Sequence, residues 1–291
     1  MRHRVTVFIK IGKISLSHRT LISGRFAALN TNISDFTFAN VFLFRDVYHY
    51  SLVENDYTVI GCRMEDGNPC WMPLDDLRTI PREHLIRILE KHGVLFPVPE
   101  EWLDAFQGPE FSLSYKAGEQ DYLYRVEKMA AFRGRRMNRK RNRLKQFLSL
   151  YRHEAKELIP GRLTDALGIL DAWQAETGSG EEGTDYRPCL EALHLSERLH
   201  LDGMVYYVEG EPAGFLVGEH LNHATYVIHF AKGIKSYKGL YEFMFNDTAK
   251  RLLNRYEFLN LEEDLGRESL RVAKSAYDPA LLVKKFRVSL K

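Results

Sequence analysis

The chain has 291 residues, enough for one large domain or two domains of average size. Hydrophobic residues make up 45% of it, and no apolar run approaches the roughly 20 residues that cross a bilayer, so we expect a globular protein without a membrane span. The formal net charge of +2 gives no indication of a nucleic-acid partner. The three cysteines form no CxxC pair and no zinc-spaced cluster with histidine, which indicates a reducing, cytoplasmic location and no metal.

The first half predicts two helices followed mainly by short strands. Ser17 can cap a helix that runs to about Leu29, and the aromatic-rich segment 34–44 favours a second, short helix. Turn-forming residues separate the next apolar stretches and predict a meander with strands at 50–53, 57–62 and 69–72. An amphipathic helix over 82–92 follows, and three further strands complete this half, at 94–98, 111–115 and 122–126.

Residues 127–150 predict a long basic helix with an intermittent apolar stripe, and we place the connection between two domains there. Acidic residues are scarce in its centre, so i, i+4 pairing cannot neutralise the charge. A run of charge on a helix is commonly only a solvated face. The functional alternative is a grip on the phosphates of tRNA or of a nucleotide-containing donor. The candidates for that grip are Arg135, Arg136, Arg139, Lys140, Arg141 and Arg143.

The second half, 151–291, has the clearer pattern. Helices are predicted at 163–176 and 185–200, with a flexible Gly- and Glu-rich stretch between them. Three strands follow, then a loop rich in Gly and Lys, and then a helix over 239–254 with two clean i, i+4 rows of mostly apolar residues. The remaining order is strand, helix, strand, at 258–261, from Gly266, and at 281–290. A weaker copy of this element order runs from about 50 to 126.

This order, with a Gly-containing loop before the central helix, resembles the GNAT (Gcn5-related N-acetyltransferase) fold. Three motifs point to one branch, namely SDFTFAN at 34–40, RGRRMNRKRN at 133–142 and NLEEDLG at 260–266. Together they resemble bacterial proteins grouped with the C-terminal domain of phosphatidylglycerol lysyltransferase, which are similar to Fem-type peptidoglycan aminoacyltransferases in carrying two GNAT-like domains on one chain. The resemblance implies an α/β (α+β) fold of two such domains, over 1–126 and 151–291, each a mixed, mostly antiparallel sheet flanked by helices.

The same resemblance implies a reaction class, the transfer of an acyl or aminoacyl group from acyl-CoA or aminoacyl-tRNA to an amine. The chain shows no counterpart of the membrane half of the lysyltransferases, so we do not expect a lipid acceptor. Acetyl-CoA users of the GNAT fold carry Gln/Arg-x-x-Gly-x-Gly/Ala before the central helix. This chain has Ser236 at the first of these positions and Tyr241 at the last. The departure argues against a tight pyrophosphate cradle, which aminoacyl-tRNA users do not need.

The loop before helix 239–254 is the candidate donor site. A helix N-terminus offers unpaired N–H groups and partial positive charge, lysines attract phosphate, and glycine permits close backbone approach. The alternative is an ordinary solvated turn that starts a helix. The candidates for binding coenzyme A or another phosphate-bearing donor are Lys232, Gly233, Lys235, Ser236, Lys238 and Gly239.

Four residues are candidates for the chemistry. Glu262 and Asp264 follow a buried strand, where a carboxylate could bind the acceptor amine or take its proton, although Asp264 could equally cap the next helix. Tyr277 lies where many GNAT enzymes place a tyrosine that protonates the leaving group, although an aromatic there is more commonly a packing residue. His229 lies on the third predicted strand, either as a hydrogen-bonded core residue or as a base.

The sequence therefore favours a tandem acyltransferase or aminoacyltransferase whose second domain carries the chemistry. The first domain is expected to be structural, because carboxylates at Asp75 and Asp76 stand where a phosphate cradle would need Gly and basic residues. The main alternative is a catalytically inactive module of the same fold that binds tRNA or nucleotide. A scaffold that dimerises through the aromatic-rich segment 36–48 is a weaker alternative.

Overall fold

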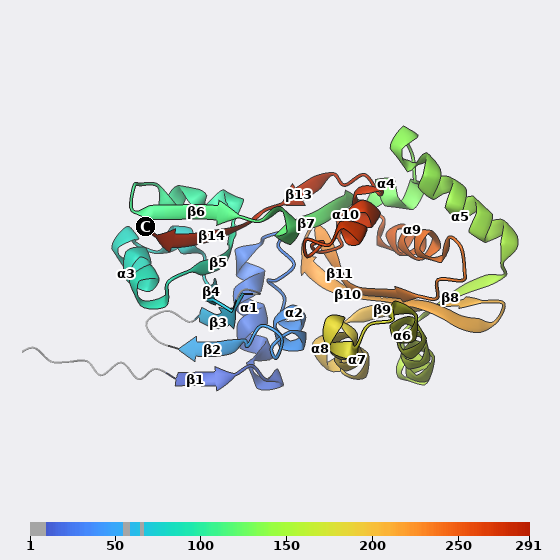
Figure 1. The fold of residues 1–291 in the computed structure, drawn as a ribbon, viewed down its shortest axis with the longest axis horizontal. Coiled ribbons are helices and arrows are strands. Elements are labelled where there is room, and N and C mark those ends of the chain that lie inside the picture. The colour runs from blue at the N-terminus through green and yellow to red at the C-terminus, as the bar shows by residue number, and fades with distance from the viewer. Residues whose placement is uncertain (1–9, 55–58, 65–66) are drawn as a thin grey trace, which may run out of the picture. The chain divides into compact units, whose positions relative to one another are not determined.

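The computed structural model describes residues 10–54, 59–64 and 67–291, and the chain divides into two compact units (Figure 1). Unit 1 comprises Met1–Glu119 and Lys284–Lys291, and unit 2 comprises Gln120–Val283. Each unit is built on a seven-stranded sheet. Within the described ranges, no helix is both long and apolar enough to cross a bilayer.

Unit 1 has a mixed sheet in the order β1-β2-β3-β4-β5-β14-β6. Every pair is antiparallel except β4 and β5. Its strands are β1 (Lys10–Lys13), β2 (Ser51–Glu54), β3 (Val59–Arg63), β4 (Pro69–Pro73), β5 (Leu95–Pro99), β6 (Phe111–Tyr115) and β14 (Lys285–Leu290). Its α-helices are α1 (Arg19–Leu29), α2 (Phe38–Leu43) and α3 (Arg82–His92). The expected start of the second meander strand, at Tyr57, lies outside the described residues.

The aromatic-rich segment forms the short helix that we predicted. Thr37 caps α2, since its hydroxyl accepts a hydrogen bond from the backbone N–H of Asn40 at 3.1 Å. Phe36, Phe38 and Phe42 are buried in the core of unit 1. These rings are therefore used for packing, which leaves the segment little apolar surface for dimerisation.

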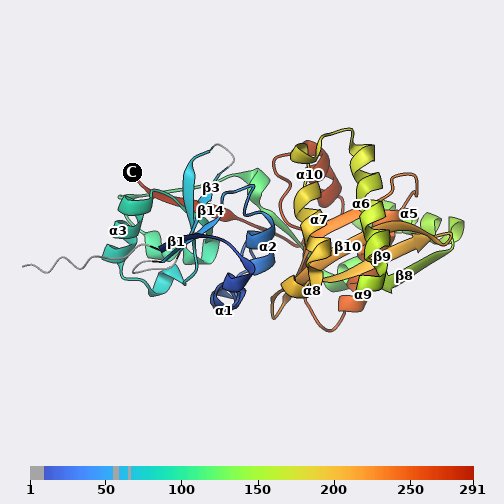
Figure 2. The same ribbon diagram turned by 90° about the horizontal axis from the view of Figure 1, so that it is seen from below.

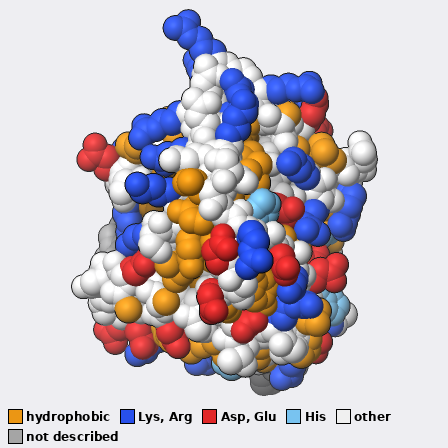
Figure 3. All heavy atoms as spheres, turned by 90° about the vertical axis from the view of Figure 1, so that its right-hand side faces the viewer, with side chains coloured by type: hydrophobic (Ala, Val, Ile, Leu, Met, Phe, Trp, Pro, Cys, Tyr) orange, Lys and Arg blue, Asp and Glu red, His pale blue; other side chains and the backbone are white. Residues whose placement is uncertain are grey.

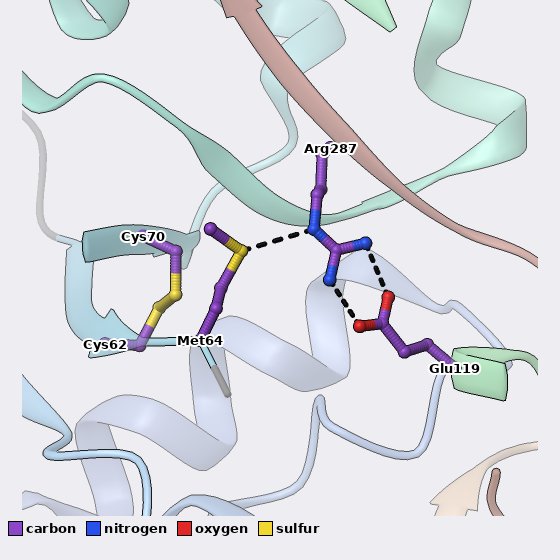
Figure 4. The surroundings of a disulfide bond; sticks show 5 residues. All are labelled: Cys62, Met64, Cys70, Glu119 and Arg287. Atoms are coloured by element: carbon purple, nitrogen blue, oxygen red, sulfur yellow. Dashed lines mark hydrogen bonds and ion pairs between the residues drawn. A yellow bond between two sulfur atoms is a disulfide. The ribbon is translucent and has the colours of Figure 1, made fainter. Parts of the chain in front are cut away.

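A disulfide joins two neighbouring strands of unit 1. Cys62 of β3 and Cys70 of β4 lie opposite each other in the ladder, with their Cα atoms 5.0 Å apart. The cysteine spacing did not lead us to expect this bridge. Figure 4 shows Arg287 nearby, where its guanidinium pairs with the carboxylate of Glu119 and its Nε donates to the sulfur of Met64 at 3.2 Å.

Unit 2 has a mixed sheet in the order β13-β7-β12-β11-β10-β9-β8. Again one pair, β11 and β12, is parallel. Its strands are β7 (Asp121–Arg125), β8 (His153–Glu157), β9 (Asp202–Val208), β10 (Glu211–Asn222), β11 (Thr225–Gly233), β12 (Phe258–Asn260) and β13 (Leu281–Val283). Its helices include α4 (Val126–Ala131), α5 (Asn138–Leu150), α6 (Leu163–Thr177), α7 (Tyr186–His194), α8 (Ser196–Leu199), α9 (Leu240–Leu252) and α10 (Glu268–Ser275).

Helices cover both faces of the sheet in unit 2. Helices α6 and α7 lie on one face, and α4, α5 and α9 lie on the other (Figures 1 and 2). The apolar cluster on the α9 side includes Tyr206 and Leu216 from the sheet, Met244 from α9 and Phe147 from α5. One predicted i, i+4 row, from Leu240 to Leu252, lies on the buried side of α9, whereas the other is only partly buried and ends at the exposed Leu253 beyond the helix.

The two sheets repeat one topology, which confirms the predicted repeat of element order. In each unit a meander leads to a helix, and the strand after that helix makes the parallel pair. The sixth strand of each sheet comes from elsewhere in the chain: β14 lies between β5 and β6, and β7 lies between β12 and β13. This is the mixed, mostly antiparallel arrangement predicted from the sequence.

Three differences from the predicted elements concern sheet membership and helix continuity. Strand β7 follows β6 in the chain, so we assigned it to the first half, but it pairs with β12 and β13 of unit 2. The single strand expected over 281–290 is two strands in two sheets, β13 and β14. The long basic helix is interrupted, because Phe132 (φ 44°) and Gly134 (φ 95°) take left-handed backbone conformations that end α4 before α5 begins.

Candidate functional site

Strands β11 and β12 separate after a short parallel contact. They pair at three positions only, from Thr225 opposite Phe258 to Val227 opposite Asn260. Strand β11 continues to Gly233, whereas β12 ends at Asn260. Beyond this point no backbone ladder joins the two strands, so side chains from both sides can meet in the opening.

A β-bulge places His229 at this opening. In the ladder with β10, Gly218 lies opposite Ile228 and Val217 lies opposite Phe230, so His229 is the extra residue on β11. The bulge brings the backbone of β11 against Gly218, where an added Cβ would lie only 2.2 Å from the carbonyl oxygen of Val227. Glycine is therefore required at 218 for the strand to carry the bulge.

The His229 imidazole is held between two carboxylates. Its Nδ1 lies 2.7 Å from Oε1 of Glu262, and its Nε2 lies 2.9 Å from Oε1 of Glu219. The imidazole is fully buried, while the side chains of Glu219 and Glu262 are 14% and 19% exposed. The three groups thus form a row from β10 across β11 to the segment after β12, with its two ends open to solvent.

This arrangement keeps His229 protonated. Burial by itself lowers the pKa of the imidazole, but the hydrogen bonds and charges of Glu219 and Glu262 outweigh it and raise the pKa to about 10. Both ring nitrogens are engaged, so His229 is not free to act as the base that the sequence allowed for. Its role in the geometry is to hold two carboxylates at the opening.

His229 and Glu262 were candidates from the sequence, but Glu219 was not. We ended the strand at Gly218, whereas β10 continues to Asn222. The sequence feature that could have indicated Glu219 is its position directly after Gly218, where the strand continues. Only the bulge, which local sequence does not show, makes that residue face the histidine.

Asp264 and Tyr277 are buried and engaged in contacts that stabilise unit 2. Asp264 is completely buried, where it accepts hydrogen bonds from the Tyr122 hydroxyl at 2.7 Å, from the Gly266 N–H at 2.8 Å and from the Arg271 guanidinium. The bond from Gly266 lies in the turn before α10, whose N-cap residue is Arg267, so Asp264 does not cap that helix as the alternative to catalysis expected. Tyr277 is buried among aromatic rings that include Phe132, and burial holds the pKa of its hydroxyl well above the ordinary range.

The Gly- and Lys-rich loop is largely engaged within unit 2. The ammonium of Lys232 is buried against the carboxylate of Asp185, at 2.6 Å, and lies over the Trp173 ring. The N–H of Gly233 donates to the hydroxyl of Tyr241, and Lys235 bonds to Glu176. Ser236 and Lys238 are exposed. The loop thus offers fewer free cations to a donor than its composition suggests.

Helix α9 begins within one residue of the predicted start, and α5 covers its N-terminus. Gly239 has φ 92°, and an added Cβ there would lie 2.6 Å from the backbone carbonyl of Arg143. The backbone that comes close to Gly239 is therefore that of α5, and not a bound donor as the sequence suggested. In the first turn of α9 the buried carboxylate of Glu242 lies 3.1 Å from the ammonium of Lys140 and 3.4 Å from Arg143.

The basic segment divides into paired and exposed residues. Lys140 is buried at its ion pair, Arg136 pairs with Asp278 at 2.9 Å, and Arg141 donates to the carbonyl of Phe132. Arg135 and Arg139 are exposed and make no ion pair with any described residue. Figure 3 views the molecule from the side that is on the right in Figure 1, and many Lys and Arg side chains lie on its upper part, where α5 is.

The comparison with known proteins identifies the family. The sequence model described as phosphatidylglycerol lysyltransferase, C-terminal, matches residues 26–289. The chain belongs to this family.

Two solved structures share this fold, and one further protein matches part of the sequence. A conserved protein of unknown function from Bacteroides thetaiotaomicron is 26% identical, with a TM-score of 0.86 over 98% of this chain and 100% of that one. FemX is 7% identical, with a TM-score of 0.61 over 97% of each chain, which shows the fold alone. An uncharacterized protein of Mycoplasmoides gallisepticum is 23% identical over 175 residues, and the match spans 56% of its length and 58% of this chain. The predicted fold of two mixed, mostly antiparallel sheets flanked by helices is therefore confirmed.

Proposed function

We propose that unit 2 transfers an aminoacyl or related acyl group to an amine, in the opening between β11 and β12. The observation that carries the proposal is the pair of partly exposed carboxylates, Glu219 and Glu262, held there by a buried imidazolium. Membership of a family named for a lysyltransferase supports this reaction class. Unit 1 is then structural: in the loop after β4, Asp75 pairs with Arg25 and Asp76 caps a short helix.

The chemistry needs an amine that has lost its proton and a carbonyl held beside it. The amine nitrogen attacks the ester or thioester carbonyl, the N–C bond forms, and the bond to the leaving oxygen or sulfur breaks as that atom takes a proton. In our proposal a carboxylate of the pair binds the acceptor as an ammonium ion and then accepts its proton, directly or through water. Positioning the two reactants together supplies much of the remaining rate.

Aminoacyl-tRNA is the donor that the geometry favours over acyl-CoA. The positive end of the α9 dipole already has an internal anion, Glu242, and α5 covers Gly239. A pyrophosphate would have to displace both. The exposed Arg135 and Arg139 on the adjacent basic segment instead suit the phosphates of a larger nucleic acid.

Charge reversal on α5 tests the donor assignment. We expect Arg139→Glu to weaken the binding of an aminoacylated tRNA about tenfold and to reduce the slope of log affinity against log salt by about 1. The matched control is Lys250→Glu, the same charge change at an exposed lysine of α9. Fluorescence anisotropy over a salt series measures both. Equal effects of the two variants, or tighter binding of acyl-CoA than of tRNA, would contradict the assignment, and binding without any transfer would support the inactive module.

A further inference from the structure

The segment after β12 has an unusual backbone at a residue of the site. Glu262 has φ 58°, in the left-handed region that non-glycine residues rarely occupy unless their surroundings hold them there. The side chain of Asn260 accepts a hydrogen bond from the N–H of Glu262 at 2.7 Å, which closes a turn. The conformation of this single residue decides where the Glu262 carboxylate lies relative to His229.

One lysine holds the backbone of this turn. The Nζ of Lys274, in the last turn of α10, lies 2.6 Å from the carbonyl oxygen of Leu261 and 3.1 Å from that of Glu262, and it also donates to the carbonyl of Glu263. In an extended strand successive carbonyls point to opposite sides, so three in succession cannot meet one donor. They converge here because the chain turns at Glu262, and an ammonium has three N–H groups with which to bind them.

A second contact from the same helix acts on a different part of the segment. Arg271, one turn earlier on α10, binds the side chain of Asp264 and not the backbone of the turn. Helix α10 therefore fixes the segment at two points. Of these two residues, Lys274 is the one that binds the backbone of Glu262, whose carbonyl oxygen also accepts a hydrogen bond from the N–H of Tyr122 at 3.2 Å.

We propose that Lys274 is a positioning residue that holds the left-handed turn at Glu262 and so keeps the Glu262 carboxylate on the His229 imidazole. The proposal rests on the proposed function in one respect, that Glu262 serves the transfer. The geometric part is independent of activity, because the charge state of His229 reports directly whether Glu262 is in place.

The test is an NMR titration of His229 in the full chain. In Lys274→Met we expect the pKa of His229 to fall by at least about 1 unit, because one of its two carboxylate partners is released. Lys274→Arg, which keeps a charged donor, should restore most of the wild-type value. Arg267→Met removes an exposed charge beside the same helix and should leave the titration unchanged. The His229 signal is assigned by its loss in His229→Gln.

A double variant makes the outcome specific. Once Glu262→Gln has removed the carboxylate, adding Lys274→Met should change the pKa of His229 no further. An unaltered pKa in folded Lys274→Met, or a drop of equal size in the Glu262→Gln background, would overturn the proposal. If Lys274→Met does not fold, Lys274→Gln keeps two N–H donors and is measured in its place, with a smaller drop expected and no drop contradicting the proposal. Failure of transfer in the wild-type protein would overturn the proposed function and leave this result standing.

Discussion

Replacement of Glu242 by alanine should lower the free energy of unfolding by about 3–5 kcal/mol. The side chains of Glu242 and Lys140 are only 5% and 10% exposed, and the Lys140 ammonium also lies 3.7 Å from the centre of the Tyr277 ring. Burial already lowers the pKa of Lys140, and Glu242 opposes that shift. Without the carboxylate an uncompensated cation remains between α5 and α9. Chemical denaturation at neutral pH measures the loss.

A double replacement separates the ion pair from its packing. Lys140→Met combined with Glu242→Leu removes both charges and keeps apolar volume, so we expect its stability to lie within about 1 kcal/mol of wild type. A cost below 1 kcal/mol for Glu242→Ala would show that water reaches Lys140. A double variant as unstable as the single one would assign the loss to packing. Either result would contradict the argument that the Glu242 carboxylate occupies the N-terminus of α9 in place of a bound phosphate.

The stability of the protein should fall as pH rises through the alkaline range. His229 has a pKa of about 10 in the folded protein and about 6.5 when unfolded. A group whose pKa is raised by folding stabilises the protein fully below its unfolded value and loses that contribution as pH approaches the folded value. The unfolding free energy should therefore decrease between about pH 6.5 and 10, by about 1.4 kcal/mol for each unit of the shift.

Isosteric removal of the carboxylates provides the comparison for this pH dependence. In Glu219→Gln combined with Glu262→Gln, burial of the imidazole is no longer opposed by two charges, so the decrease attributable to His229 should disappear. Other groups titrate alike in both proteins, and the difference between the two curves isolates the cluster. Parallel curves across this range would mean that His229 is not held as an imidazolium.

Strongly periodic elements were predictable from the sequence, and pairings set by distant segments were not. The apolar rows of α9 placed that helix to within a residue or two, because burial of one face enforces the 3.6-residue period. Strands β7 and β14 were recognised as strands, but nothing in five or six residues states which sheet they join. The exchange of strands between the two sheets depends on non-local contacts alone.

The residues of the candidate site also differ in how far the sequence could indicate them. His229 and Glu262 were named from the sequence as separate candidates, and the pairing of β11 with β12 brings them into contact. Glu219 depended on a bulge, and the local pattern does not reveal one. Lys140 was a different error: with Met137 and Leu144 it shares the spacing of one helical face, so the apolar stripe itself marked it as buried. Lys140 therefore belongs to the buried face of α5 and not to the exposed charge run.

The most direct test of the central claim is the single-turnover rate of transfer from a radiolabelled aminoacyl-tRNA, pre-bound at saturation, to an amine acceptor. We expect Glu262→Gln to reduce this rate by about 100-fold or more, while donor affinity stays at the wild-type value. Glu263→Gln, next to it in the chain, is the matched control and should retain the wild-type rate. A Glu262→Gln variant that transfers as fast as wild type would contradict the assignment of the reaction to the carboxylates around His229.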